Sequence, residues 1–459
     1  LTTIHFKKPD FSGFFYICNL MKLGSHIKKN LFLSFPIMLS QLGHITVGVV
    51  DSIMVGKIGV TQLASVSLSN SLFGFILLFC IGLSYGITPL ISSANNNQKY
   101  ISRIFFHGII MNMIFTIFLV LLVINLKNYL LYLGQDNAVL NYAFPYLDLI
   151  CISLIPLILF QTFKQFIEGL GFTKPAMYIS IFSNVINIIL NFILIFGMFG
   201  FPRLEIIGAA YATLISRVLM FIMIFFYCLI SKRFSKYIVS VKLLFNMSSF
   251  KKIFNIGFPS GLQYIFEVGA FSVATIMIGS IGANALAAHQ IALNLASITY
   301  MIASGISSAA MISLGYYYGK NDIGELRKSG HSNFYLALIL MTISGLIFII
   351  FRNLLPQLYV SDLAVIKIAS ILLIIAGLFQ IPDGIQAVGL GILRGIRDTK
   401  IPTLVTFISY WIFAIPLSYF LGITLNLGTV GIWIGLFFGL TLSAIFHVVR
   451  FNYLTMIKN

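Results

Sequence analysis

The sequence predicts an all-α integral membrane protein with twelve transmembrane helices arranged in two six-helix lobes. Hydrophobic residues make up 59% of the 459 residues and charged residues only 9%, with a mean hydropathy of +0.99. Soluble domains, in contrast, contain about 25% charged residues. Apolar windows of about twenty residues recur along the chain, which indicates helices, since strands of a membrane barrel need only about ten alternating residues. The first half of the chain also resembles the second half.

This internal repeat extends over most of both halves. Pro36 falls on Pro259 at a shift of 223 residues, and the same shift places Ile53–Gly59 on Ile276–Gly282. A further match at this shift pairs Gly208 with Gly431. Because each half holds an even number of predicted helices, both halves enter the membrane from the same side. The repeats are therefore parallel, and substrate sites of such transporters lie near the midplane where the two repeats face each other.

The apolar windows define the predicted elements and their order. Spanning helices are expected at 31–55, 67–93, 104–126, 141–167, 176–198, 206–230, 253–281, 289–316, 332–351, 365–394, 401–422 and 430–453. The resulting domains are a basic cytoplasmic tail (1–30), a first lobe (31–230), a cytoplasmic linker (231–252), a second lobe (253–453) and a second cytoplasmic tail (454–459).

The positions of the basic residues predict the orientation of the chain. The net charge is +17, but twenty-two of the lysines and arginines fall on predicted inner segments or inner helix ends, and only Lys57, Lys127, Arg203 and Arg352 fall on outer loops. This asymmetry places both termini in the cytoplasm. It also explains the positive charge without nucleic acid. Of three further bases inside predicted helices, Lys164 and Lys367 are close enough to helix ends to extend to the interface, whereas Arg217 needs a partner or water.

Four acidic residues lie well inside predicted helices: Asp51, Asp148, Glu267 and Asp383. A carboxylate at the centre of a spanning helix costs about 3 kcal/mol, so each needs a physical reason. Binding of a coupling ion, either H⁺ or Na⁺, is one reason, and a structural pair with a base or backbone donor is the other. Asp148 is nearer an outer helix end, where the structural interpretation is favoured.

Glu267 and Asp383 are predicted at similar depths in the second lobe, so the two carboxylates could share one cation. In the first lobe the repeat places His44 opposite Glu267, and Gln41 precedes His44 by one turn on the same helix face. His44 could titrate near neutral pH or be a hydrogen-bonded packing residue.

A polar stripe marks the helix expected at 176–198. Asn184, Asn187 and Asn191 recur every three to four residues in an otherwise apolar span, and Thr213 on the following helix could add an oxygen. Such a stripe must face protein or water. Hydrogen bonding between helices and cation ligation are both open interpretations of it.

The motifs resemble the multidrug and toxic compound extrusion (MATE) transporters, and most closely their bacterial norfloxacin-efflux (NorM) branch. The resemblance covers residues 25 to 450. It is carried by Pro36 with Asp51–Gly56, Pro259 with Phe266-Glu267, Ala287–Ile291, Pro382-Asp383, Leu393–Gly395 and Asp398–Lys400. It implies a V-shaped fold and a secondary antiporter in the bacterial inner membrane, which exports organic cations and amphiphilic drugs in exchange for Na⁺ or H⁺. We expect a monomer in the lipid bilayer that has no enzymatic activity. We expect it to need no cofactor and to bind no metal beyond transported Na⁺.

The resemblance also implies which residues bind the coupling ion. It places a first-lobe cation site at Asp51, Asn187, Asn191 and Thr213, and a second-lobe site at Glu267 and Asp383. His44, Gln41, Phe379 and Asn184 are candidate cavity residues. This sequence departs from the pattern at Asn191, where some members carry a second aspartate, and at Phe379, where some carry tyrosine. The choice between Na⁺ and H⁺ therefore stays open.

Three other function classes fit the residues less well than export of cations. A flippase for lipid-linked substrates would share the V-shaped architecture but should need several bases for pyrophosphate, and Arg217 is the only base deep in a predicted helix. A membrane-embedded enzyme would need a nucleophile with its base or a metal cluster, and the seven histidines show no such spacing. A channel would not need acids in each of two rocking lobes.

Overall fold

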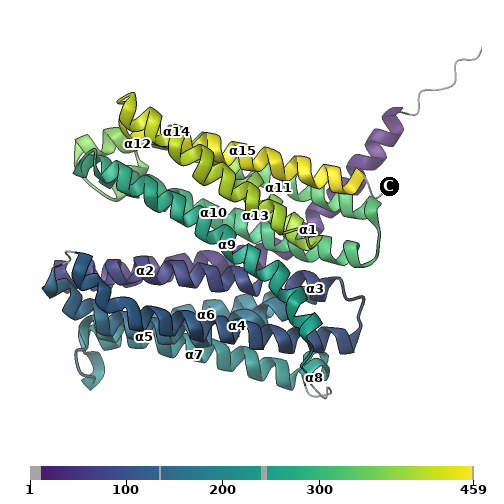
Figure 1. Cartoon of the computed structure of the whole chain (residues 1–459), viewed down its shortest axis with the longest axis horizontal. Helices are drawn as coiled ribbons and strands as arrows, with labels where there is room; N and C mark the ends of the chain where they lie inside the picture. Colours follow the sequence, from purple (N-terminus) through teal and green to yellow (C-terminus); the bar gives the residue numbers. More distant parts are fainter. Residues whose placement is uncertain (1–11, 134–135, 239–244, 457–459) are drawn as a thin grey trace, which may run out of the picture.

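The molecule consists of two helical bundles that correspond to the two halves of the sequence (Figure 1). The computed structural model describes residues 12–133, 136–238 and 245–456. Within these ranges, 12 helices are long and apolar enough to cross a membrane. The first lobe contains α1 (Ser12–Gly56), α2 (Val60–Ser84), α3 (Thr88–Ser92), α4 (Gln98–Leu126), η1 (Lys127–Leu133), α5 (Asn137–Gly169), α6 (Lys174–Phe196), η2 (Met198–Gly200) and α7 (Glu205–Ile230).

The second lobe repeats this arrangement after the short helix α8 (Lys232–Ile238). It contains α9 (Met247–Gly279), α10 (Ala283–Gly319), α11 (Ile323–Ile350), η3 (Leu355–Leu358), α12 (Leu363–Gly395) and α15 (Gly428–Met456). Its fifth span runs through α13 (Lys400–Phe407), η4 (Ile408–Ala414), α14 (Ile415–Tyr419) and η5 (Phe420–Thr424), where two segments of π-helix flank Pro416. A proline that removes a helical hydrogen bond accounts for such local adjustment.

Most spanning helices are longer than the apolar windows that predicted them. Several of the additional turns are polar, and side-chain caps stabilise some of them. Asn97 accepts a hydrogen bond at the start of α4, Asp136 at α5, Asn246 at α9, Asp322 at α11 and Asp362 at α12. A cap of this kind satisfies one of the free N–H groups of the first turn. A hydropathy window cannot detect these turns because their side chains are not apolar.

Two of the segments predicted to lie outside the membrane spans contain helix. The segment predicted as a tail (1–30) becomes helical at Ser12, although residues 1–11 lie outside the described residues, as do 457–459 of the second tail. The segment predicted as a linker (231–252) holds α8 and the first turns of α9, and its residues 239–244 also lie outside the described part. α8 packs on α4 and α7 of the first lobe.

The two lobes contact each other through repeat-related helices. The first helix of each lobe packs against the second helix of the other, so that α1 contacts α10 and α9 contacts α2. A Cβ added at Gly82 would lie 2.7 Å from Cα of Gly261, and one added at Gly305 would lie 2.9 Å from the backbone nitrogen of Met38. These two crossings are related by the same shift of 223 residues. The duplication therefore extends to the close contacts between the lobes.

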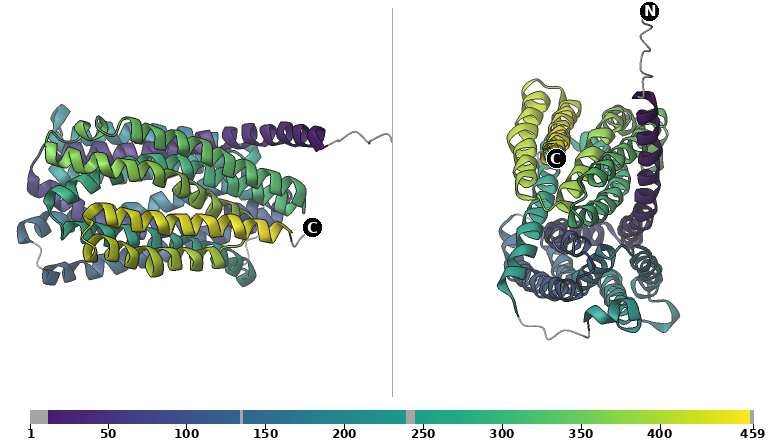
Figure 2. Two further views of the ribbon diagram at one scale, coloured as in Figure 1. Left: turned by 90° about the horizontal axis from the view of Figure 1, so that it is seen from above. Right: turned by 90° about the vertical axis from the view of Figure 1, so that its right-hand side faces the viewer.

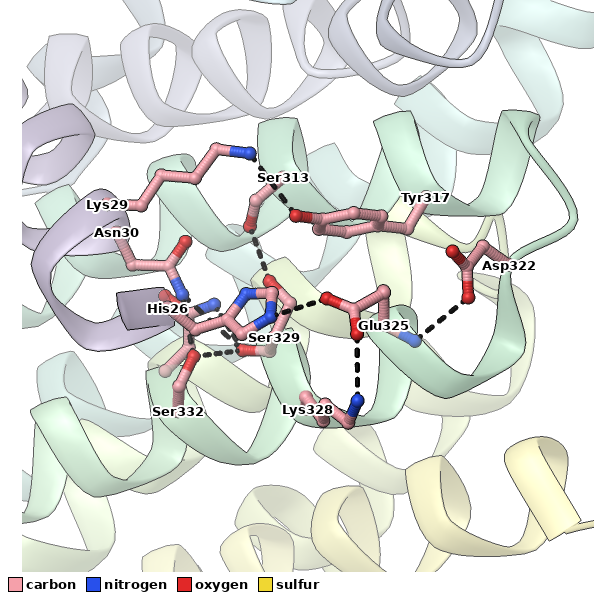
Figure 3. Close-up of polar contacts among 11 residues, drawn as sticks. His26, Lys29, Asn30, Ser313, Tyr317, Asp322, Glu325, Lys328, Ser329 and Ser332 are labelled. Carbon is pink, nitrogen blue, oxygen red and sulfur yellow. Dashed lines mark hydrogen bonds and ion pairs between the residues drawn. The ribbon is translucent and has the colours of Figure 1, made fainter. Parts of the chain in front are cut away.

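Helix α1 is shared between the lobes (Figure 2). It contacts α10 and α11 of the second lobe and α6 of the first lobe. Figure 3 shows polar contacts at the end of the bundle where α1 begins: His26 Nε2 lies 2.8 Å from Glu325 Oε2, and the Asn30 amide donates to Ser332 Oγ at 2.8 Å. α1 thus connects a second-lobe contact surface to the first-lobe segment that carries Asp51.

Candidate functional site

Two adjoining cavities open among the described residues, one in each lobe. The cavity of about 400 Å³ in the first lobe is called the N-lobe cavity, and the cavity of about 330 Å³ in the second lobe is called the C-lobe cavity. Leu78 of α2 and Met301 of α10 line both, so the cavities meet where the lobes face each other. Both volumes are in the range of small-molecule binding sites.

The N-lobe cavity brings together most of the predicted first-lobe residues. Those that line it are Gln41, His44, Asp51, Asn184, Asn187 and Thr213. Gln41 reaches across to the other lobe, where its amide nitrogen lies 3.5 Å from Ser304 Oγ. Asn184 faces Gly43, and its amide nitrogen has no hydrogen-bond partner. The polar stripe of α6 therefore faces protein and cavity, as its pattern requires.

Asp51 begins a chain of side-chain hydrogen bonds. Asn191 Nδ2 donates to Asp51 Oδ1 and also to Asn187 Oδ1, the latter at 3.1 Å. Asn187 in turn donates to Ser216 Oγ at 3.3 Å, and Ser216 donates to the backbone oxygen of Thr213 at 3.0 Å. Asn191 Oδ1 is buried without a partner. This arrangement offers several oxygens to a cation but only one carboxylate.

The C-lobe cavity contains both acids predicted for the second lobe. Glu267 of α9 is 7% exposed and Asp383 of α12 is 3% exposed, and both line the cavity. The two carboxylates are close enough to interact electrostatically. Gln380, one turn before Asp383, is fully buried, and neither of its amide atoms has a hydrogen-bond partner. Two buried acids that line one cavity form a site that a cation can neutralise.

Aromatic rings form much of the remaining wall of the C-lobe cavity. They belong to Tyr264, Phe271, Tyr300, Phe379 and Trp433. Ring faces of this kind attract cations without requiring one ligand shape. Phe379 lies where the sequence analysis expected a cavity residue, one turn before Asp383.

Trp433 is held in place by His289, and sequence reasoning assigned a role to neither residue. Trp433 Nε1 donates to His289 Nδ1 at 3.1 Å, which leaves His289 Nε2 as the donor to Thr275 Oγ1 at 2.9 Å. These bonds fix a neutral imidazole and one tautomer. The repeat pairs Trp433 with Ala210 of the first lobe. A tryptophan in one lobe where the other lobe has an alanine was the sequence signal that could have identified Trp433.

Asp148 lies outside both cavities. Its carboxylate pairs with Lys127, which also lies over the ring of Phe144 at 5.6 Å. The side chain of Asp148 is 33% exposed and that of Lys127 is 17% exposed. This is the structural pairing that the sequence analysis favoured for Asp148.

The sequence-based expectation for Lys164 is wrong. Its Nζ does not extend to the membrane interface but lies 4.0 Å from Glu168 Oε1, and the two side chains are only 3% and 2% exposed. Every residue from 160 to 169 is buried, because this end of α5 is surrounded by protein. Helix boundaries predicted from hydropathy indicate how far a residue lies from a helix end. They do not indicate which other helices pack around that end.

Arg217 of α7 lines the N-lobe cavity and finds partners that the sequence could not specify. Its Nη1 donates to Ser153 Oγ at 2.6 Å, and its guanidinium lies over the ring of Phe73 at 5.2 Å. Ser216, which joins the Asp51 chain, was also missed, although it follows Thr213 by three residues on the same helix face.

Comparison with known proteins gives matches over nearly the whole chain. The family model described as MatE matches twice, at residues 36–193 and 259–420, so the two matches begin at the prolines that define the repeat. "Multidrug resistance protein NorM" of Photobacterium profundum is 30% identical over 435 residues, which cover 93% of this chain and 95% of that protein. "Multidrug resistance protein MdtK" of Yersinia pseudotuberculosis is 30% identical over 434 residues, 92% of this chain and 94% of that protein.

Solved structures share the fold. An outward-facing multidrug resistance MATE family transporter of the MOP superfamily superposes with a TM-score of 0.88 at 19% identity, covering 95% of this chain and 97% of that one. The eukaryotic MATE transporter AtDTX14 gives a TM-score of 0.83 at 22% identity, covering 93% and 96%.

Proposed function

The chain belongs to the MatE family of multi-pass membrane transporters, and we propose that it exports organic cations and amphiphilic drugs by antiport against Na⁺ or H⁺. The two lobes would alternate between access to one side of the membrane and access to the other. Names of the relatives support multidrug export as the outcome. The chemistry of this chain's own cavities supports the exchange of one cation for another.

One observation carries the proposal: the Glu267 and Asp383 carboxylates share a cavity with aromatic walls. Two ionised acids in a low-dielectric site repel each other and lose hydration, so the empty site favours capture of a cation. An organic cation can gain a further 0.5 to 2 kcal/mol, roughly, over aromatic faces. Competition between the small ion and the drug for the same acids would couple their opposite movements.

The N-lobe chain of Asp51, Asn191, Asn187 and Thr213 is proposed as a second, weaker cation site. Its amide and hydroxyl oxygens suit Na⁺, but Asp51 supplies the only carboxylate in the chain. Either sodium or a proton on Asp51 is consistent with this set. For this reason the proposal leaves the coupling ion open and tests the two gradients separately.

We further propose a monomer in a bacterial inner membrane with both termini in the cytoplasm. The excess of basic residues on the predicted inner segments supports this orientation. Export by this mechanism requires no cofactor.

A flippase for lipid-linked pyrophosphates is less consistent with the cavities. Among the described residues that line the two cavities, Arg217 is the only lysine or arginine. A pyrophosphate carries several negative charges and is normally bound by more than one base. Two acids in the C-lobe cavity would repel it.

The proposal is tested by ethidium efflux from proteoliposomes under a sodium gradient and, separately, under a proton gradient. Glu267→Gln and Asp383→Asn should each reduce gradient-driven efflux to the level of protein-free liposomes. Asp148→Asn is the matched control, because Asp148 is also an acid within a spanning helix but lies outside both cavities. Efflux that persists in both cavity variants would refute the proposed role of these acids.

A further inference from the structure

A third cavity lies where the two lobes meet, at the end of the bundle shown in Figure 3. Its volume is about 720 Å³, and neither proposed cation site uses it. It is lined by Lys29 of α1, by the turn between α3 and α4, and by the turn between α10 and α11. Each of these turns follows the second span of its lobe, so the repeat places both at the same end of the molecule. We call this space the junction cavity.

The two lobes touch each other beside the junction cavity. The Asn95 amide of the first lobe donates to the backbone oxygen of Gly319 of the second lobe at 2.6 Å. A Cβ added at Gly319 would lie 2.5 Å from the backbone oxygen of Ser93, so a glycine is needed for this close approach. A ligand in the junction cavity would therefore contact both lobes while their ends are packed together.

Bases and amides line the junction cavity, and acids do not. Lys29 and Lys320 contribute two ammonium groups, and Asn95, Asn96 and Asn321 contribute three side-chain amides. Its described lining residues include no aspartate, glutamate or histidine. Both lysines are exposed, and neither takes part in an ion pair within the described ranges. The wall of the cavity therefore attracts an anion.

Tyrosine side chains, rather than carboxylates, position the two lysines. Lys29 Nζ donates to the Tyr317 hydroxyl at 3.2 Å (Figure 3) and lies 5.6 Å from the centre of the Tyr316 ring. Lys320 Nζ lies 4.4 Å from the centre of the same Tyr316 ring. Contacts of this kind hold an ammonium group without neutralising it. Asp322 interacts electrostatically with Lys320, but its carboxylate caps α11 and does not line the cavity.

We propose that the junction cavity is a phosphate-binding site, which holds the phosphate group of an anionic lipid or free inorganic phosphate. Lysine binds phosphate as a compact point charge, and asparagine amides can donate to the remaining phosphate oxygens. Apolar lining residues such as Leu33 and Ile312 suit the first methylene groups of a lipid. The lysines lie on the side that we propose to be cytoplasmic, where anionic headgroups attract basic residues.

A phosphate in the junction cavity would connect the two lobes. Lys29 approaches it from α1 of the first lobe, and Lys320 approaches it from the end of α10 in the second lobe. A ligand that contacts both lobes in one arrangement stabilises that arrangement and raises the unfolding temperature of the protein. The inference is independent of the cation that the transporter exchanges.

Thermal unfolding of the full-length protein in detergent tests the site. The midpoint is measured against dioctanoyl phosphatidylglycerol, with dioctanoyl phosphatidylcholine for comparison. It is measured separately against potassium phosphate, with potassium chloride at equal ionic strength, so that no Na⁺ is added. Phosphatidylglycerol should raise the midpoint at lower concentrations than phosphatidylcholine does. Lys29→Gln and Lys320→Gln should each increase the concentration for the half-maximal effect by about fivefold.

Two further variants separate a site from the general attraction of a basic surface. Lys99→Gln is the matched control, because Lys99 is an exposed lysine of α4 that does not line the junction cavity. It should leave the half-maximal concentrations unchanged. Lys29→Arg keeps the positive charge and should change them much less than Lys29→Gln does.

The two titrations also distinguish the sources of the phosphate group. An effect of phosphatidylglycerol alone that depends on the two lysines assigns the site to a lipid, and a similar effect of potassium phosphate assigns it to the free anion. If Lys29→Gln and Lys320→Gln respond to both ligands as the natural protein does, or if Lys99→Gln weakens the response equally, the site is overturned. Cation export would still stand in that case, because it depends on the other two cavities.

Discussion

The N-lobe and C-lobe cavities come from one duplicated sequence but carry different chemical groups. At the shift of 223 residues, His44 of the N-lobe cavity corresponds to Glu267 of the C-lobe cavity. Asp51 corresponds to Ala274, which is 1% exposed in the second hydrophobic core. On α1, Asp51 therefore lies about two helical turns after His44, the residue that corresponds to Glu267.

The basic residue of the N-lobe cavity, Arg217, also has no counterpart of the same kind in the second lobe. Arg217 corresponds by the repeat to Leu440, which is fully buried in the core of the second lobe. In contrast, the two crossings at Gly82 and Gly305 are preserved. The duplication therefore retained these close helix contacts between the lobes, while the polar residues of each cavity diverged.

The largest effect is expected when the C-lobe cavity receives the residue of the other lobe. Glu267→His should reduce gradient-driven ethidium efflux to background, because it leaves Asp383 as the sole acid of that cavity. Adding His44→Glu should not restore efflux, since the restored acid lies in the wrong lobe. The measurement is efflux from proteoliposomes, and substantial recovery in the double variant would show that the two lobes are interchangeable.

The preserved crossings give the next largest effect. Gly82→Ala and Gly305→Ala should each destabilise the folded protein by about 1–3 kcal/mol, because the added methyl group meets backbone atoms of the other lobe. Thermal unfolding in detergent measures the change. Gly74→Ala is the matched control in the same helix as Gly82, since a Cβ there meets nothing within 4 Å. Equal melting temperatures for all three variants would contradict the role of the crossings.

A smaller change should make the two cavities more alike. Asn191→Asp places a second carboxylate beside Asp51, and cation affinity generally rises with the number of charged ligands. The sodium concentration for half-maximal stimulation of efflux should fall by about tenfold, or about 1.4 kcal/mol. Asn184→Asp adds the same charge on the same helix without a contact to Asp51 and should have less effect. If both variants lowered this sodium concentration equally, the effect would come from the added negative charge in general and not from a binding site at Asp51.

The smallest effect is expected where α1 meets α11. Glu325→Gln removes the charge that His26 and Lys328 contact at 2.8 Å (Figure 3). The Glu325 side chain is 35% exposed, and pairs of this kind contribute about 0–1 kcal/mol. The melting temperature should therefore change less than in Gly82→Ala. A larger loss would indicate that this contact holds the lobes together.

Much of the fold could be predicted from the sequence because membrane insertion imposes strong patterns. The repeat was visible as residues that match at one constant shift, and the twelve apolar windows follow from the cost of exposing polar groups to lipid. The same cost made the cavity residues Asp51, Glu267 and Asp383 recognisable, because acidic side chains are rare within spanning helices. The positions where helices begin were less predictable, because they depend on caps such as Asp322.

Tertiary packing decided the features that sequence patterns did not reveal. Lys164 is surrounded by protein, and the bond between His289 and Trp433 joins helices 144 residues apart. Arg217 was recognised as needing a partner, but neither Ser153 nor Phe73 could be chosen from periodicity alone. Side chains that meet only after the helices assemble leave no local signal in the sequence.

The most direct test of coupled export is to measure both movements in the same proteoliposomes. Ethidium fluorescence follows the drug, while radioactive sodium and a trapped pH-sensitive dye follow the two candidate ions. Ethidium moving outward should drive one ion inward, and Asp383→Asn should remove both fluxes together. Ethidium efflux that continues without any counter-movement of sodium or protons would contradict antiport through the acids of the C-lobe cavity.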